Sequence, residues 1–330
     1  MARCAHKTPL YASVIVPNGN GRHHLAACLG SLGRQRIAQD FEILLVDNHS
    51  TDDSIPYVRA NFPNVRIVPL AWNGVFAGAV NAGLRIARGE YIVLLNNDAE
   101  ADPDWLAELL RQLESTPEAG MAASKILLWD RRDALHSAGD FYGFDGIPGN
   151  RGVWGIDDGR FDDDHLIFGA CAGAAAYRRT LFESIGLLDD SLVAYCEDVD
   201  LNLRAHLAGW QCVYAPRARI YHRLSATGGG PLASYSCGRN FIVVALRDLP
   251  APILRRHGGT ILVAQLRIAA EALLHLGEPA ARARLRGQFA GLRAIPRAWA
   301  QRPGIHSGSV IPWHALESWL ALRDRPTAGG

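Results

Sequence analysis

The chain has 330 residues, 48% of them hydrophobic, and a formal net charge of +1. This length is enough for one large α/β domain with an appendage, or for two domains. Because the net charge is close to zero, the composition gives no basis for nucleic-acid binding, and we expect no nucleic-acid partner.

The cysteines and the apolar segments predict a cytoplasmic location. The six cysteines include no C-x-x-C pair, and none has a histidine at zinc-ligand spacing, which favours free thiols in a reducing compartment. Residues 1–12 lack the apolar core of a signal peptide. The most apolar long stretch, Ile261 to Leu276, contains Arg267 and Glu271 and is therefore not expected to span a membrane.

The N-terminal part of the chain alternates strand-like and helix-like segments. Apolar runs typical of buried strands occupy Ser13–Val16, Phe41–Val46, Val65–Val68 and Tyr91–Leu95. Helical spacing predicts helices over about 25–32 and 77–87, and a third after an N-cap at Asp102 with Pro103 in the first turn. This order predicts a mainly parallel, doubly wound sheet, in which ligands bind at the carboxyl ends of the strands.

The C-terminal part is less regular at first and then basic. Residues 129–164 are rich in Gly and Asp and predict an irregular insertion, before a helix starting near Glu197 and two short strands, Trp210–Tyr214 and Arg219–His222. From residue 235 arginines outnumber acids among leucines at helical spacing. We therefore expect a domain over 1–234 and a basic amphipathic helical tail over 235–330. The tail is expected either to bind the inner face of the membrane or to pack on its own domain or a partner subunit.

Polar residues cluster directly after the predicted strands. Asn18 and Asn20 follow the first strand, Asp47 and Asn48 close the second, and Asn96-Asn97-Asp98 close the fourth. A carboxylate at this edge of the sheet can supply the hard oxygen ligand that a divalent cation needs to bridge a diphosphate. The alternative is a turn cap, since Asn and Asp are common after strands.

Three further segments carry candidate groups. A predicted helix starts with three carboxylates, Glu197, Asp198 and Asp200. The helix dipole and an i, i+4 pair with Arg204 explain Asp200. Another carboxylate at the same helix start can act as a general base. His222, at a strand end, is either structural or a late metal ligand. The small residues 169–174 allow either close approach of a ligand or tight strand packing.

The order of these motifs resembles the inverting family 2 glycosyltransferases of the GT-A fold, especially the bacterial branch that includes rhamnosyltransferases. The segments that carry the resemblance are Val14–Gly21, Leu45–Asp52, Asn73–Gly83, Asn96–Asp98, Glu197–Asp198 and His222. The first strand is not followed by G-x-G-x-x-G, which disfavours a nicotinamide dehydrogenase. Two places depart from the family pattern: Gly19 replaces an aromatic residue, and Val75, Ala79 and Val80 replace Gly, Gly and Asn.

The resemblance implies a role for each matching residue. It implies a GT-A fold with a mixed, mainly parallel sheet, helices on both faces and a C-terminal helical tail. Asp98 and His222 would hold a divalent metal ion, Mg²⁺ or Mn²⁺, and Asp198 would be the catalytic base, with Glu197 as its competitor. Donor-binding residues would be Pro17, Asn18, Asn20, Asp47, Asn48, Asn81, Asn96 and Asn97.

The implied reaction is transfer of a sugar with inversion in cell-surface polysaccharide biosynthesis. The donor would be a dTDP- or UDP-linked sugar, with rhamnose favoured, and the acceptor a glycan or a lipid-linked glycan. The alternative is a donor-binding or scaffold protein of a glycan assembly system with little activity of its own. The altered residues around Gly19 and Val75 favour that alternative, and Asp98, Asp198 and His222 disfavour it.

Overall fold

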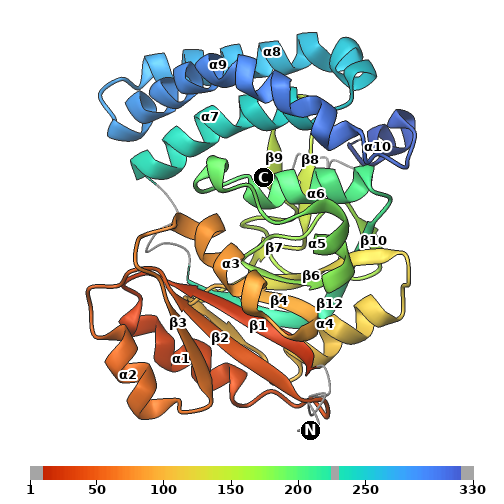
Figure 1. Ribbon diagram of the computed structural model, residues 1–330. Coiled ribbons are helices and arrows are strands. Elements are labelled where there is room, and N and C mark those ends of the chain that lie inside the picture. The colour runs from red at the N-terminus through yellow and green to blue at the C-terminus, as the bar shows by residue number, and fades with distance from the viewer. Residues whose placement is uncertain (1–9, 224–229, 321–330) are drawn as a thin grey trace, which may run out of the picture.

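A mixed sheet of ten strands forms the centre of the N-terminal part of the molecule (Figure 1). The computed structural model describes residues 10–223 and 230–320. The main strands run in the order β10-β12-β6-β11-β4-β1-β2-β3, while β5 pairs with β12 and β7 pairs with β6. Their bounds are β1 Leu10–Asn18, β2 Phe41–Asp47, β3 Val65–Pro69, β4 Gly89–Leu95, β5 Ala99–Ala101, β6 Ala119–Leu128, β7 Leu135–Ser137, β10 Leu166–Ile167, β11 Ala174–Arg178 and β12 Gln211–His222.

Strand direction brings the predicted polar residues to one edge of this sheet. β1 runs parallel to β2 and β4, and β12 runs parallel to β6. β11 lies antiparallel between β4 and β6, so β6 and β12 point the same way as β1, β2 and β4. The carboxyl ends of these strands therefore share an edge, and the predicted mixed, mainly parallel sheet with helices on both faces is confirmed.

Helices cover both faces of the sheet. Helices α1 (Arg22–Leu32), α2 (Ser54–Asn61) and α4 (Trp105–Glu114) bury their apolar sides in one core, and α3 (Val75–Ile86), α5 (Arg179–Ile185) and α6 (Glu197–Leu207) in the other. The close packing of α3 requires Gly83, where a Cβ atom would lie 2.7 Å from Ile15 and 3.1 Å from Val46.

The structure corrects several predicted elements. Residues 211–222 form one strand with an irregularity between Ala215 and Arg219, not two strands. The helix after Asp102 begins at Trp105, with Asp104 at its N-cap. The predicted irregular insertion contains three strands. β7 pairs with β6, and β8 (Asp140–Tyr142) pairs with β9 (Pro148–Asn150) as a separate hairpin. The strand β6, buried along its whole length, was not predicted.

Four helices form a layer above the sheet domain: α7 (Gly230–Asp248), α8 (Ala251–Leu274), α9 (Pro279–His306) and α10 (Trp313–Leu320) (Figure 1). Val243 and Val244 of α7 pack with Leu203 and Leu207 of α6 in a third buried cluster. The C-terminal helices are thus confirmed, and α7 packs on the sheet domain. Within residues 10–223 and 230–320, no helix has the length and apolar character needed to cross a membrane.

The cysteines within the described residues are free. Cys28, Cys196 and Cys212 are buried, and Cys171 and Cys237 are half-buried. Cys4 lies outside the described residues.

Candidate active site

Asp98 and His222 meet because of the pairing between β5 and β12. In this antiparallel pair His222 lies opposite Ala99, the residue after Asp98. The backbone N–H of Arg223 donates to the carbonyl of Asp98 at 3.0 Å. As a result His222 Nε2 lies 3.0 Å from Asp98 Oδ1, and both side chains are largely buried. The two predicted metal ligands are therefore in direct contact at the carboxyl edge of the sheet.

A second imidazole, which the sequence analysis missed, completes this arrangement. His136 of β7 stacks on His222 with 5.0 Å between ring centroids, and the two Nδ1 atoms are 3.1 Å apart. Burial, followed by the nearby His222, lowers the pKa of His136 to about 4, so this ring is neutral at physiological pH. A neutral His136 can accept a hydrogen bond from His222 Nδ1–H, and in that tautomer His222 Nε2 carries a lone pair and can act as a ligand.

Asparagine side chains join the strand ends beside this pair. Asn97 Nδ2 donates to Asn18 Oδ1 at 2.8 Å, and Asn18 Nδ2 donates to Asp47 Oδ1 at 3.2 Å. Asn96 Nδ2 lies 3.3 Å from His222 Nε2. Gly21 makes the cluster possible, because a Cβ atom there would lie 2.1 Å from Asn97 Nδ2. The ends of β1, β2 and β4 are thus fixed relative to one another.

Two other predicted donor-binding side chains, those of Asn20 and Asn48, hydrogen-bond within the fold. Asn20 Oδ1 accepts from the N–H of Thr51 at 2.7 Å. The Asn48 amide accepts from the N–H of Gly74 and donates to the carbonyl of Val75. Their contact with a donor remains a prediction.

Asn81 is almost fully buried, and its amide bonds to both backbone groups of Leu188 and to Asp190. The structure therefore shows it positioning the segment between α5 and α6. Pro17, in contrast, is half-buried in β1 opposite Val46.

The acidic helix α6 starts from a strained turn. Val193, Tyr195 and Cys196 all have positive φ, at 66°, 65° and 68°. Such conformations cost about 1–3 kcal/mol each for residues other than glycine and persist only where the surroundings impose them. Asn240 of α7 supplies that constraint by donating to the carbonyls of Leu192, Ala194 and Tyr195. The C-terminal helices thus fix the turn that presents Glu197 and Asp198.

Asp198 and Glu197 have different environments. Asp198 is half-buried, and its carboxylate accepts from the N–H of Val199 at 2.9 Å and of Ala172 at 3.3 Å. Burial raises its pKa above the usual range. Glu197 is buried, its Oε2 has no partner among the described residues, and burial together with Asp198 raises its pKa well above the usual range. Asp198 is therefore the better oriented and more accessible of the two carboxylates.

A further carboxyl group, Asp140 of β8, faces the same place. One ligand atom each from Asp140, Cys171 and Asp198 lie within 4.8 Å of one another. Burial raises the pKa of the Cys171 thiol well above its usual range, so it remains protonated and is a poor ligand for a hard cation. Burial and the neighbouring Asp198 also raise the pKa of Asp140 well above its usual range. This group therefore fits proton handling better than metal binding.

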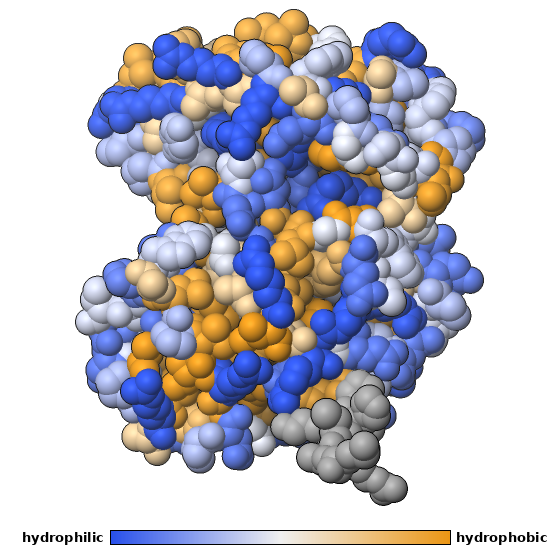
Figure 2. Space-filling view, viewed as in Figure 1, coloured by the Kyte–Doolittle hydropathy of each residue, from blue (hydrophilic) through white to orange (hydrophobic). Residues whose placement is uncertain are grey.

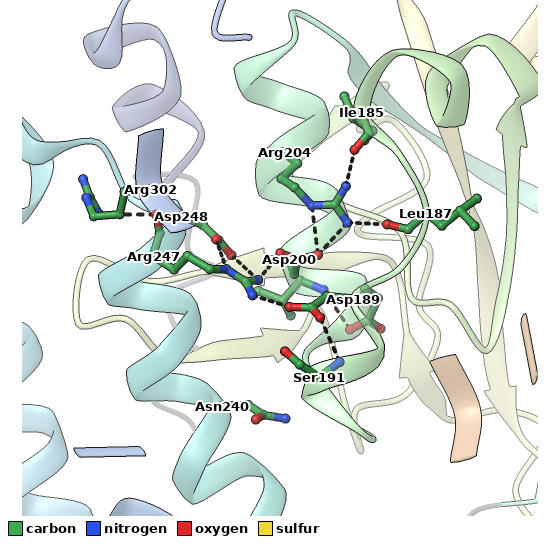
Figure 3. A network of polar contacts seen from close by, with 12 residues as sticks. Ile185, Leu187, Asp189, Ser191, Asp200, Arg204, Asn240, Arg247, Asp248 and Arg302 are labelled. Carbon is green, nitrogen blue, oxygen red and sulfur yellow. Dashed lines mark hydrogen bonds and ion pairs between the residues drawn. The ribbon is translucent and has the colours of Figure 1, made fainter. Parts of the chain in front are cut away.

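On its other side, α6 is held by an ionic network (Figure 3). Arg204 bonds to Asp200 at 2.6 Å, as the i, i+4 spacing predicted. Arg247 of α7 pairs with Asp189, Asp200 and Asp248. All of these side chains except the half-buried Asp189 are buried or nearly so, and removing one partner of such a buried pair is strongly destabilising.

This fold and this edge of polar residues are typical of enzymes that bind nucleotide sugars, and comparison with known proteins identifies the family. The profile described as Glycosyl transferase family 2 matches residues 13–186. Because this match covers more than half of the 330 residues, the chain belongs to glycosyl transferase family 2.

Curated relatives include proteins of cell-surface biosynthesis. The chain is 30% identical over 233 residues to the uncharacterised protein y4gI of Sinorhizobium fredii, and 30% identical over 228 residues to the O-antigen biosynthesis protein RfbC of Myxococcus xanthus. These matches cover 67% and 65% of the chain but only 25% and 17% of those longer proteins. An N-acetylglucosaminyl-diphospho-decaprenol L-rhamnosyltransferase of Mycobacterium tuberculosis is 27% identical over 72% of the chain and 81% of its own length.

Solved structures support the fold. TarS 1–349 of S. aureus has a TM-score of 0.59 at 18% identity, with 94% of this chain and 88% of that chain covered. The mannosyltransferase PcManGT of Pyrobaculum calidifontis, in complex with GDP-Man and Mn²⁺, has a TM-score of 0.54 at 18% identity, with 96% and 82% covered. The GT-A fold is thereby confirmed.

Proposed function

We propose that the chain transfers a hexose from a nucleotide-diphosphate sugar to a glycan or lipid-linked glycan, with inversion at the anomeric carbon. The observation that carries the proposal is the pairing of Asp98 with His222 at the carboxyl edge of the sheet, together with Asp198 held by two backbone N–H groups at the start of α6. A scaffold protein that only bound the donor would need no such oriented carboxylate.

The residues present fit a divalent cation. Asp98 offers a carboxylate oxygen and His222 a ring nitrogen 3.0 Å apart, and His136 can accept a hydrogen bond from His222 Nδ1–H, which would leave this nitrogen available to a metal. Mg²⁺ or Mn²⁺ bound there would stabilise the charge on the departing diphosphate. Asn96 and Asn97 would contact donor oxygens from the same loop.

The role of Asp198 follows from its position on a different element from Asp98. In a direct displacement the acceptor hydroxyl approaches the sugar opposite the departing diphosphate, so the base must lie across the sugar from the metal. Asp198 would take the hydroxyl proton, and its raised pKa makes it a better acceptor than an ordinary aspartate. The buried Glu197 is the competing residue.

The donor and acceptor are proposed from the relatives. The mycobacterial relative is an L-rhamnosyltransferase with an N-acetylglucosaminyl-diphospho-decaprenol acceptor, which supports a dTDP-linked rhamnose donor and a lipid-linked acceptor here. We also propose peripheral binding to the inner membrane face by α8 and α9. These helices expose Leu262, Leu266, Leu274 and Phe289 beside exposed arginines.

The test is a screen of nucleotide sugars by thermal shift, with and without Mn²⁺ or Mg²⁺, followed by analysis of the anomeric configuration of the product by NMR. A dTDP- or UDP-sugar should raise the melting temperature most, and the shift should need the cation. A larger shift with a GDP-sugar would contradict the proposed donor, and a product of retained configuration would contradict the proposed mechanism.

A further inference from the structure

The C-terminal helices enclose an apolar groove that lies outside the strand-end site. A cavity of about 510 Å³ lies between α7, α8 and α9. Its lining is Ile242, Ala245, Leu246, Ala251, Leu254, Arg255, Gly258, Ile261, Leu262, Gln265, Leu292, Ile295 and Trp299. From Ala251 to Gln265 the lining extends along roughly 21 Å of α8, at the usual helical rise. The groove is therefore elongated and nearly all apolar.

The rim of this groove is apolar surface that the described residues leave uncovered. Leu262, Leu292 and Trp299 are 59%, 56% and 55% exposed. Gly258 lies in the middle of α8, where glycine costs about 1 kcal/mol relative to alanine. No described atom lies within 4 Å of a Cβ built there. The missing side chain keeps the groove open, and packing within the protein does not require the glycine.

The charge around the groove selects an anionic ligand. Helices α8 and α9 contain nine arginines and one acidic residue, Glu271. Arg255 lies in the lining itself, and Arg293 and Arg297 are exposed on α9. Figure 2 shows hydrophilic side chains alternating with apolar ones over this layer of the molecule. A long hydrocarbon with a phosphate headgroup matches both the apolar lining and the basic rim.

We propose that this groove binds the hydrocarbon chain of the lipid-linked acceptor, whose phosphate is held by the arginines at the rim. The proposal rests on the proposed function. Helix α7 supports the proposal because it connects the groove with the turn before Glu197. Ile242 of α7 lines the groove, and Asn240 of α7 donates to backbone carbonyls of that turn. The acceptor would thus be bound through its chain while its sugar reaches Asp198.

The binding test uses dodecyl phosphate brominated along its chain, which quenches a tryptophan that it contacts. We expect saturable quenching of Trp299 in the full-length protein, and loss of this signal in Trp299→Phe. Gly258→Phe should weaken binding at least about tenfold by filling the groove. Gly259→Phe is the matched control: Gly259 has equally open surroundings but does not line the groove, so affinity should be unchanged.

Two outcomes would overturn the proposal. One is equal quenching in the Gly258→Phe and Gly259→Phe variants. The other is that anionic phospholipid vesicles with brominated acyl chains quench Trp299 as strongly in Gly258→Phe as in wild type, which would assign this face to general membrane contact. Saturable quenching in a protein that transfers no sugar would leave the groove intact and refute the proposed function instead. Sugar transfer to a lipid-linked acceptor without quenching of Trp299 would refute the proposed groove and leave the proposed function intact.

Discussion

The strand-end site and the α6–α7 interface are both built from buried polar side chains, but they are assembled differently. At the site, Asn18 ends β1 and both Asn97 and Asp98 follow β4 of the same sheet, so sheet topology alone brings them together. At the interface, Arg247 of α7 meets Asp189 and Asp200, which lie 58 and 47 residues earlier in the chain. The first cluster follows from local sequence order and the second from the docking of two separate parts.

Helix α6 belongs to both clusters, and this shows how they depend on each other. Asp198 is half-buried beside Ala172, whereas Asp200, two residues later, is buried against Arg247. Residues two apart point to different sides of a helix. Residues on both sides of the expected domain boundary between 234 and 235 therefore make the contacts that hold the proposed base. The C-terminal helices position this part of the site.

The largest effect should come from the strand-end cluster. Asp98→Ala should abolish sugar transfer, because the developing charge on the diphosphate would lose its cation. His222→Ala should reduce transfer less, since water can replace one neutral ligand. The measurement is initial rate against Mn²⁺ concentration for wild type and both variants. Full wild-type activity in excess chelator would exclude the metal from the reaction.

The second prediction concerns the proposed base. Asp198→Asn should lower kcat by a factor of roughly 10² to 10⁴ while donor binding is kept. Because burial raises the pKa of Asp198, kcat of the wild type should fall on the acid side at a pH above the usual aspartate range, and the variant should lack this limb. Glu197→Gln is the comparison. If that variant loses turnover and Asp198→Asn does not, the base is Glu197.

The strand-end residues could be predicted because they depend on short-range sequence order. A buried apolar strand followed by Asn or Asp already places a polar group at the edge of the sheet, as for Asn18 and Asp98. His136 and Asp140 could not be found this way. They lie in the segment 129–164, whose Gly- and Asp-rich composition conceals strands as short as three residues, and only pairing with β6 and with β9 positions them.

The docked interface could not be predicted for a different reason. A sequence rich in arginine and leucine is equally consistent with a membrane-binding helix and with one that packs on protein. Nothing near Asn240 or Arg247 in sequence reveals that their partners are carbonyls and carboxylates some 50 residues away. The roles of the polar residues of α7 can thus be assigned only from the tertiary structure.

The third prediction tests this interface through Asn240. Asn240→Ala leaves the buried carbonyls of the turn before Glu197 without their donor, so it should destabilise the protein by about 1–3 kcal/mol. It should also lower kcat by roughly tenfold, because a small displacement of Asp198 is costly. Gln288→Ala is the control, since this buried amide bonds only to Gln265 among the described residues. It should lower stability without changing kcat, and an equal loss of kcat in both variants would make Asn240 merely structural.

The smallest effect is a pH dependence of stability that arises from the same interface. In the network two arginines, Arg204 and Arg247, face three carboxyl groups, those of Asp189, Asp200 and Asp248. One proton would therefore make the network neutral, and burial, with the nearby Asp200, raises the pKa of Asp248 to about 8.

The unfolded chain loses this proton near pH 4, whereas the folded protein keeps it up to about pH 8. Since the folded state binds more protons in this window, the contribution of Asp248 to the free energy of unfolding must fall as pH rises from about 4 to about 8, by at most about 1.4 kcal/mol per pH unit. Asp140, Glu197 and Asp198 also have raised pKa values and contribute in the same direction.

The informative quantity is therefore the difference in unfolding free energy between wild type and Asp248→Asn, measured by urea denaturation from pH 5 to pH 9. It should decline up to about pH 8 and then level off. A difference that stays constant over this range would mean that Asp248 is ionised in the folded protein.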